Sequence, residues 1–241
     1  VSNRSCKVLP SLKQRLRSLL MSALEVLNSK VIACGLCDRL VQWREQVAKE
    51  KRAAYADQTY WGKPVPSFGD PSAHLLIVGL APAAHGANRT GRMFTGDRSG
   101  DFLFAALHRL GYANQAAATS REDGLELTGA YITAPLRCAP PQNKPTAQEL
   151  GNCRDFFHEE LESLKNIKVI LALGGIGYAA IAKEFGIRPK PKFTHGLEVP
   201  LPDEKVLLCS YHVSQQNTFT GRLTEDMFDN VLRRARELGQ K

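Results

Sequence analysis

The chain has 241 residues, of which 43% are hydrophobic and 23% charged, with 19 Gly and 13 Pro. This length and balance fit a globular chain with its own core, and they exclude a mostly disordered chain, a collagen and a coiled coil. The 32 Lys and Arg against 24 Asp and Glu leave a net charge of +8, which is typical of nucleic-acid-binding proteins and equally of enzymes acting on small anionic metabolites. No apolar run approaches the ~20 residues that cross a bilayer and no signal-peptide core is visible, so we expect a soluble, cytosolic protein without membrane association.

Leucines at helical spacing over residues 10–30 predict an amphipathic helix. We interpret residues 1–30 as an N-terminal helical extension and residues 31–241 as the main domain. A second helix is expected over residues 38–54. The Pro-, Gly- and aromatic-rich segment 60–71 is expected to be a loop.

From residue 75 onward, predicted strands alternate with predicted helices. Strands are expected over residues 75–79, 131–133, 168–174 and 206–210. Helices are expected over residues 101–110 and 146–164, directly after residue 174, and over 224–238. Thr146 with Glu149 three residues later forms a capping-box pattern. The alternation predicts an α/β fold of three layers, α/β/α, around a central, mostly parallel, four-stranded sheet, whose ligands bind at the carboxyl ends of the strands.

Four of the six cysteines have the spacing of a metal site: Cys34, Cys37, Cys138 and Cys153. Disulfides are not expected in a cytosolic chain of this size. Four thiolates from two segments suit either a tetrahedral Zn²⁺ or a [4Fe–4S] cluster. The distance between Cys138 and Cys153 is not that of a zinc ribbon and leans toward iron–sulfur, but the residues alone leave both metals open. We interpret Cys209 as a core residue and Cys6 as a free thiol.

The glycine-rich segment 79–104 follows the first predicted strand and is the richest in candidate functional residues. It contains neither a Walker A motif nor a GxGxxG fingerprint. Asp97 is either a functional carboxylate or the cap of the following helix, and Phe94 is either a functional aromatic or a core residue. Three arginines in the segment suit phosphate groups: Arg89, Arg92 and Arg98.

His212 follows the last predicted strand and stands beside three amides. A lone histidine is often structural, but its place at the carboxyl end of a strand favours a functional role. The amides are Gln215, Gln216 and Asn217.

Four long motifs together resemble family 5 uracil-DNA glycosylases, the iron–sulfur type found in bacteria and archaea. They are YWGKPVPSFGDP, VGLAPAAHGANRTGRMFTGD, RCAPPQNKPT and SYHVSQQNTFTGRLT, in that order. With the spaced cysteines they cover most of the chain from Cys34 to the final helix. The resemblance implies a uracil-DNA glycosylase-like fold and a monofunctional DNA glycosylase. Such an enzyme flips uracil, and other deaminated bases such as hypoxanthine, out of duplex DNA and hydrolyses the N-glycosidic bond, leaving an abasic site for base excision repair.

The resemblance also implies a cofactor and a partner. Cys34, Cys37, Cys138 and Cys153 match the ligands of a [4Fe–4S] cluster, whose expected role is structural. The expected partner is double-stranded DNA containing deaminated bases, bound by a monomer.

Site roles follow from the matched motifs. Asp97 is expected to position or activate water, His212 to hydrogen-bond the departing base, and Phe94 to stack on it. Backbone groups at Gly79, Leu80 and Ala81, together with Asn217, are expected at the base. Contact with DNA is expected from Arg89, Arg92, Arg98, Gln215, Gln216, Arg222 and Leu223, where segment 215–223 resembles a wedge that fills the vacated stack.

Departures from related patterns point to a broad substrate range. Leu80 replaces a polar residue found in many relatives, and Ala134 stands where family 4 enzymes have a base-reading Asn; Asn143 is the candidate compensating amide. Val213 replaces a proline usually found after the motif histidine. Two alternatives remain at this point: a narrow, family 4-like uracil enzyme, and a non-catalytic iron–sulfur protein that binds DNA damage.

Overall fold

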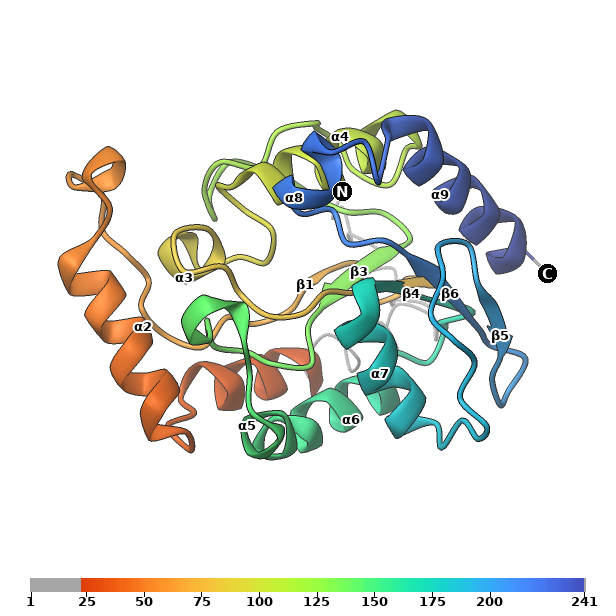
Figure 1. The fold of residues 1–241 in the computed structure, drawn as a ribbon, viewed down its shortest axis with the longest axis horizontal. Helices are drawn as coiled ribbons and strands as arrows, with labels where there is room; N and C mark the ends of the chain where they lie inside the picture. The colour runs from red at the N-terminus through yellow and green to blue at the C-terminus, as the bar shows by residue number, and fades with distance from the viewer. Residues whose placement is uncertain (1–22, 241) are drawn as a thin grey trace, which may run out of the picture.

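The computed structural model describes residues 23–240, which form a single six-stranded sheet with helices on both faces (Figure 1). The strand order is β1-β3-β2-β4-β6-β5. The strands are β1 (Phe68–Gly69), β2 (Leu75–Val78), β3 (Ala130–Thr133), β4 (Val169–Leu173), β5 (Glu198–Pro200) and β6 (Val206–Ser210).

The four central strands, β3, β2, β4 and β6, are mutually parallel, which confirms the predicted parallel centre. The prediction of only four strands is corrected to six. At the two edges, β1 pairs antiparallel with β3, and β5 pairs antiparallel with β6. The edge strands have only two and three residues, too few to show an alternating pattern, and β1 lies inside the segment 60–71 that we expected to be loop.

Helices connect the strands and cover them. Residues 23–32 are helical, and the further helices are α2 (Asp38–Glu50), α3 (Ala87–Thr90), α4 (Arg98–Arg109), α5 (Ala147–Asn152), α6 (Arg154–Ser163), α7 (Gly174–Glu184), α8 (Gln215–Phe219) and α9 (Glu225–Gly239). Two short 3₁₀ turns are η1 (Ala53–Tyr55) and η2 (Pro141–Asn143).

Three helix predictions need correction at their ends. The single helix expected over 146–164 is divided at Cys153, which ends α5 and begins α6, while the predicted capping box at its start is present. The helix expected over 38–54 ends at Glu50, because Lys51 has a positive φ of 57°. The helix expected from residue 101 begins three residues earlier, directly after its capping residue.

The predicted N-terminal helix falls partly outside the described residues, with residues 10–22 not covered. Its described part, residues 23–32, buries Leu24, Leu27 and Val31. Leu24 belongs to the core on one face of the sheet. The division of the chain at residue 30 stays a prediction.

The sheet divides the core into two layers. Leu75 and Ile77 of β2 pack with α4 and α9, whereas Leu76 and Val78 pack with α6 and α7. Alternate residues of a strand point to opposite faces, so a strand buried on both faces is apolar throughout. Figure 1 shows these helix pairs on opposite sides of the sheet, which is the predicted three-layer arrangement.

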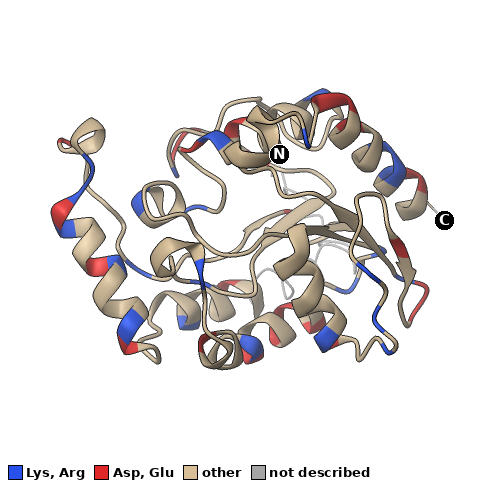
Figure 2. Ribbon diagram, viewed as in Figure 1, with Lys and Arg blue, Asp and Glu red and all other residues tan. Residues whose placement is uncertain are grey.

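Charged residues lie on the helices and loops around the sheet, and the four central strands carry none (Figure 2). The net positive charge of the chain is therefore carried by the helices and loops around the central strands. No helix within residues 23–240 is long and apolar enough to span a membrane.

Candidate active site

A cavity of about 320 Å³ lies at the carboxyl ends of β2, β3 and β6. Ligands of parallel sheets are expected at the carboxyl ends of the strands, and the volume of this cavity suits a small ring. Eight of the predicted site residues line it: Gly79, Leu80, Ala81, Phe94, Asp97, Asn143, His212 and Gln216.

Asp97 caps a helix and also lines the cavity, so the two interpretations that the sequence offered do not exclude each other. Its Oδ1 accepts a hydrogen bond from the Gly100 N–H at 3.0 Å and caps α4, while the carboxylate also lines the cavity. Burial raises the pKa of Asp97, although N–H groups of Gly100 and Ser99 oppose that shift. A carboxylate with a raised pKa is a better proton acceptor near neutral pH.

Gly86 leaves the space that this carboxylate occupies. A Cβ at Gly86 would lie 1.9 Å from Oδ2 of Asp97, far inside van der Waals contact. The absence of a side chain at this position therefore fixes where the carboxylate can stand.

His212 lies in the loop after β6, and burial lowers its pKa to about 4. The imidazole is therefore neutral at physiological pH and retains one N–H donor. Its backbone carbonyl accepts a hydrogen bond from Nδ2 of Asn217 at 2.8 Å, which ties the loop to α8.

Phe94 and His212 both line the cavity and their rings are neighbours, with centroids 6.2 Å apart and planes inclined by 32°. Phe94 adopts a positive φ of 52°, which is uncommon for an aromatic residue. Its ring lies against Gly79, where a Cβ would come within 2.8 Å of Cζ. The end of β2 and the aromatic ring thus form one wall of the cavity.

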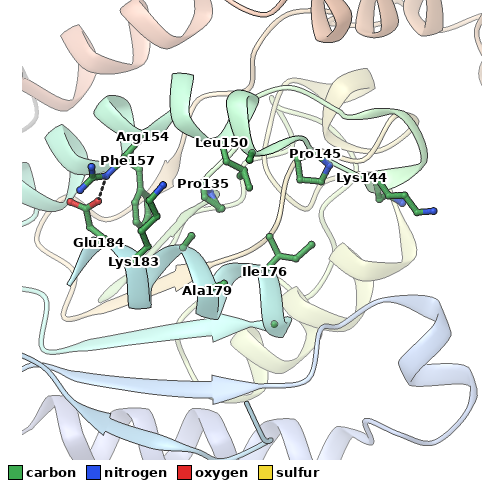
Figure 3. Close-up of a pocket in the computed structure, with 14 residues that line it drawn as sticks. Pro135, Lys144, Pro145, Leu150, Arg154, Phe157, Ile176, Ala179, Lys183 and Glu184 are labelled. Atoms are coloured by element: carbon green, nitrogen blue, oxygen red, sulfur yellow. Dashed lines mark hydrogen bonds and ion pairs between the residues drawn. The ribbon is translucent and has the colours of Figure 1, made fainter. Parts of the chain in front are cut away.

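Asn143 is the one exposed amide of η2 that borders the cavity, and it has a left-handed backbone with φ 56°. It also borders a neighbouring groove of about 500 Å³. Figure 3 shows that groove between α7 and the α5–α6 segment, with Lys144 at one end and the Arg154–Glu184 ion pair at the other. Its lining is mostly apolar, including Leu150 and Ile176.

Two predicted amides lie away from the cavity. Asn217 donates to the His212 carbonyl, so its side chain supports the loop and is not among the lining residues. Gln215 is exposed at the start of α8.

Arg89 and Arg92 do not have the free guanidinium groups that phosphate contact requires, which corrects the sequence expectation. Arg89 is 7% exposed and donates to the carbonyls of His85 at 2.8 Å and Gly96 at 2.6 Å. Arg92 is 4% exposed and forms two hydrogen bonds with Asp123, at 2.8 and 2.7 Å. Both arginines hold the glycine-rich segment in place.

The other two arginines are exposed. Arg98 stands at the first turn of α4, and Arg222 lies beyond α8 with its guanidinium 4.6 Å from the centroid of the Tyr211 ring. Leu223, expected in the DNA wedge, is only 1% exposed and packs in the core, which corrects that expectation. Phe219, at the end of α8, is instead 75% exposed.

Sequence reasoning missed three residues of this region. Ser99 and Ser214 add hydroxyl groups to the cavity, and Phe219 is the exposed apolar residue of the predicted wedge. Serines in loops give no distinctive sequence signal. Phe219 follows the amides at helical spacing, and its exposure depends on where α8 ends.

The four spaced cysteines line one small pocket between the start of α2, the segment after β3 and the α5–α6 junction. None of the five described cysteines forms a disulfide. Cys209 is fully buried in β6, as the core interpretation predicted, and Cys6 lies outside the described residues. Within residues 23–240, no group of three or more His, Cys, Asp or Glu side chains is arranged to hold a metal ion.

Comparison with known proteins identifies the fold at the level of a superfamily. The family description that matches residues 66–236 is the uracil DNA glycosylase superfamily, and this match covers all six strands of the sheet and every residue that lines the cavity.

Individual relatives narrow the assignment. Proteins named type-5 uracil-DNA glycosylase are 51% identical in Mycobacterium tuberculosis, 50% in Thermus thermophilus and 45% in Pyrobaculum aerophilum. The matches cover 88%, 89% and 86% of this chain and 80%, 97% and 89% of those proteins. The chain belongs to the type-5 uracil-DNA glycosylase family.

Proposed function

We propose that this chain releases uracil, and also hypoxanthine, from duplex DNA by hydrolysing the N-glycosidic bond. The observation that carries the proposal is that Asp97 and His212 line the same cavity, together with an aromatic ring and a polar rim. A base buried in a duplex is out of reach of such a cavity, so the nucleotide must first leave the stack.

Heterolysis of the bond leaves positive charge on the sugar and negative charge on the base. Asp97 orients a water toward the sugar carbon and accepts its proton as the new C–O bond forms. The neutral His212 imidazole donates its N–H to the base oxygen where negative charge develops. The carboxylate also stabilises the cationic sugar, so both charges meet a complementary group.

The proposed breadth of substrates rests on the side chains near the base. Leu80 and Ala134 line the cavity without any hydrogen-bonding side chain. The amides that border it are Asn143 and Gln216, both on the rim. A pocket without a buried amide discriminates weakly between bases that differ in their hydrogen-bonding edge.

The test is base release from matched duplexes carrying uracil, hypoxanthine or an undamaged base. Wild type and Asn143→Ala are compared, with Gln46→Ala as a control, because Gln46 is an exposed amide of α2 that does not line the cavity. We expect wild type to release uracil and hypoxanthine. The rate of base release should fall in Asn143→Ala and stay unchanged in the control variant. Release of uracil alone would favour the narrow, family 4-like alternative, and tight lesion binding without any release would favour the non-catalytic one.

We further propose that Cys34, Cys37, Cys138 and Cys153 hold a [4Fe–4S] cluster. Support comes from their shared pocket and from the absence of a disulfide among the described cysteines. Each cysteine of such a cluster binds a different iron, so the ligands surround a wider space than those of a single ion. The cluster would supply a covalent link between α2 and the sheet layer.

Measurement of iron and acid-labile sulfide, with the visible absorption of the purified protein, tests this cofactor. We expect both elements in stoichiometric amounts, and their loss together with lower thermal stability in Cys153→Ser. Zinc without sulfide would contradict the cluster and support the alternative metal. Cys209→Ser serves as the control, because Cys209 is absent from that pocket.

The proposed reaction has no lyase step. Lys144 is exposed and lines the groove beside the cavity. It directly follows Asn143, which lines the cavity itself. Borohydride reduction during turnover is expected to trap no protein–DNA adduct. An adduct lost in Lys144→Gln would contradict hydrolysis alone.

A further inference from the structure

Arg44 of α2 is buried beside the cysteine pocket. It is 6% exposed, and its Nη1 donates to Sγ of Cys138 at 3.1 Å. Both terminal nitrogens also lie 3.4 Å from the carbonyl oxygen of Cys34, and Nε has no partner among the described residues. The guanidinium therefore connects the segment that carries Cys34 with the segment that carries Cys138.

The charge of Arg44 has no carboxylate partner in the described part of the chain. Among the other buried arginines, Arg137 pairs with Glu160 at 2.7 Å and Arg92 pairs with Asp123 at 2.7 Å. The guanidinium of Arg89 instead donates to the carbonyls of His85 and Gly96 and to the side chain of Gln58. A buried cation without a counter-charge costs several kcal/mol. The anionic groups available to Arg44 are the thiolates of the cysteine pocket.

We infer that Arg44 is the internal counter-charge of the proposed [4Fe–4S] cluster and sets its reduction potential through the N–H···S contact with Cys138. This inference rests on the proposed cluster. A [4Fe–4S] cluster with four thiolate ligands is anionic and gains further negative charge on reduction. A cation and a hydrogen-bond donor next to one ligand therefore favour the reduced state and raise the potential.

A second donor acts on another ligand of the same pocket. Nδ2 of Asn152, the last residue of α5, lies 3.3 Å from Sγ of Cys37. This contact is neutral and partly exposed, so its effect on the potential is expected to be smaller than that of Arg44.

Arg44 also connects the cysteine pocket to the candidate active site. Its backbone carbonyl accepts a hydrogen bond from Nδ2 of Asn88 at 3.3 Å. Asn88 is fully buried in α3, next to Ala87, which lines the cavity. Arg44 therefore contacts a cysteine sulfur with its side chain and the glycine-rich segment with its backbone.

The experiment measures the midpoint potential of the cluster and its rate of loss to an iron chelator, in full-length protein without DNA. Arg44→Met removes the charge and both terminal donors at similar volume. Arg44→Lys keeps the charge without the planar fork. Lys49→Met removes a charge from the exposed part of the same helix and is the matched control.

We expect Arg44→Met to shift the potential to more negative values and to lose iron several-fold faster than wild type, with Arg44→Lys in between and Lys49→Met unchanged. If Arg44→Met does not fold, the potential and the rate of iron loss of Arg44→Lys are compared with those of wild type instead. An unshifted potential in both Arg44 variants with full iron content would overturn the role of Arg44 alone. Wild-type protein without iron and sulfide would overturn the cluster and this inference together.

Discussion

Single side chains define the chemistry of the candidate site, because a few atoms determine where the Asp97 carboxylate stands. Gly86 lies against Oδ2 and Gly100 donates to Oδ1. Both contacts come from residues that would not themselves touch a substrate. Small changes at these two positions are therefore expected to act on catalysis through Asp97.

Gly86→Ala is expected to lower the rate of base release at least tenfold, since its Cβ would displace the carboxylate. Substrate affinity should change less than the rate. Single-turnover kinetics with a uracil duplex separate the two quantities. Gly151→Ala, where nothing lies within 4 Å of the added Cβ, is the control; equal rates in the two variants would contradict the proposed contact.

The pH dependence of base release should follow Asp97. A base acts in its deprotonated form, so the rate is expected to fall as pH decreases through the raised pKa of Asp97, above the ordinary 3.8. The acid limb should persist in His212→Gln, because His212 is already neutral above about pH 4. An acid limb centred at or below 3.8 in His212→Gln would contradict the raised pKa.

At the scale of elements, the end of α8 gives opposite environments to two apolar residues that the sequence places together in one motif. Phe219 ends the helix and is exposed, whereas Leu223 returns to the core. An exposed aromatic beside basic residues suits insertion between base pairs. We therefore predict that Phe219, and not Leu223, is the wedge of the proposed DNA complex.

Phe219→Ala is expected to slow uracil release from duplex DNA about tenfold or more, and to have little effect on single-stranded DNA, which needs no wedge. Its free energy of unfolding should be nearly unchanged. Leu223→Ala is the counterpart and should lower that free energy by about 2–5 kcal/mol, because it creates a cavity in the core. Chemical denaturation and base release on both substrates test the pair; equal effects of Phe219→Ala on the two substrates would count against the wedge.

Over the whole molecule, positive charge is divided between structural and exposed arginines. Arg92 has a structural role, because its guanidinium bonds the carboxylate of Asp123. Burial alone would raise the pKa of Asp123, but hydrogen bonds from Arg92 and from backbone N–H groups outweigh burial and lower that pKa. Arg98 and Arg222 are exposed; Arg98 directly follows Asp97, and Arg222 lies against the ring of Tyr211, the residue before His212. Of the four arginines that we expected to contact DNA, Arg98 and Arg222 are the two with exposed guanidinium groups.

Arg222→Ala is expected to reduce the slope of log affinity against log salt by about one unit, while leaving stability nearly unchanged. Arg92→Met should instead destabilise the fold by about 3–5 kcal/mol, because it leaves Asp123 buried without its cation. Binding to a lesion duplex at several salt concentrations, with denaturation of each variant, provides the comparison. A changed salt slope in folded Arg92→Met would contradict its structural role.

The parallel centre of the fold was predictable because its strands are continuous apolar runs separated by helices. The edge strands β1 and β5 were not, since pairs of two or three residues depend on the neighbouring strand. At the site, motif order predicted that Asp97, Phe94 and His212 converge. Burial of Arg89, Arg92 and Leu223 depends on contacts between distant segments, such as Arg92 with Asp123, which no local pattern indicates.

The most direct measurement is single-turnover release of uracil from a duplex by wild type and Asp97→Asn. Asparagine caps helices about as well as aspartate, so Asp97→Asn should keep the free energy of unfolding within about 0.5 kcal/mol. It cannot accept the proton of water, so the rate should fall about 10²–10⁴-fold. Release by Asp97→Asn at the wild-type rate would contradict the proposed chemistry and leave Asp97 with its capping role alone.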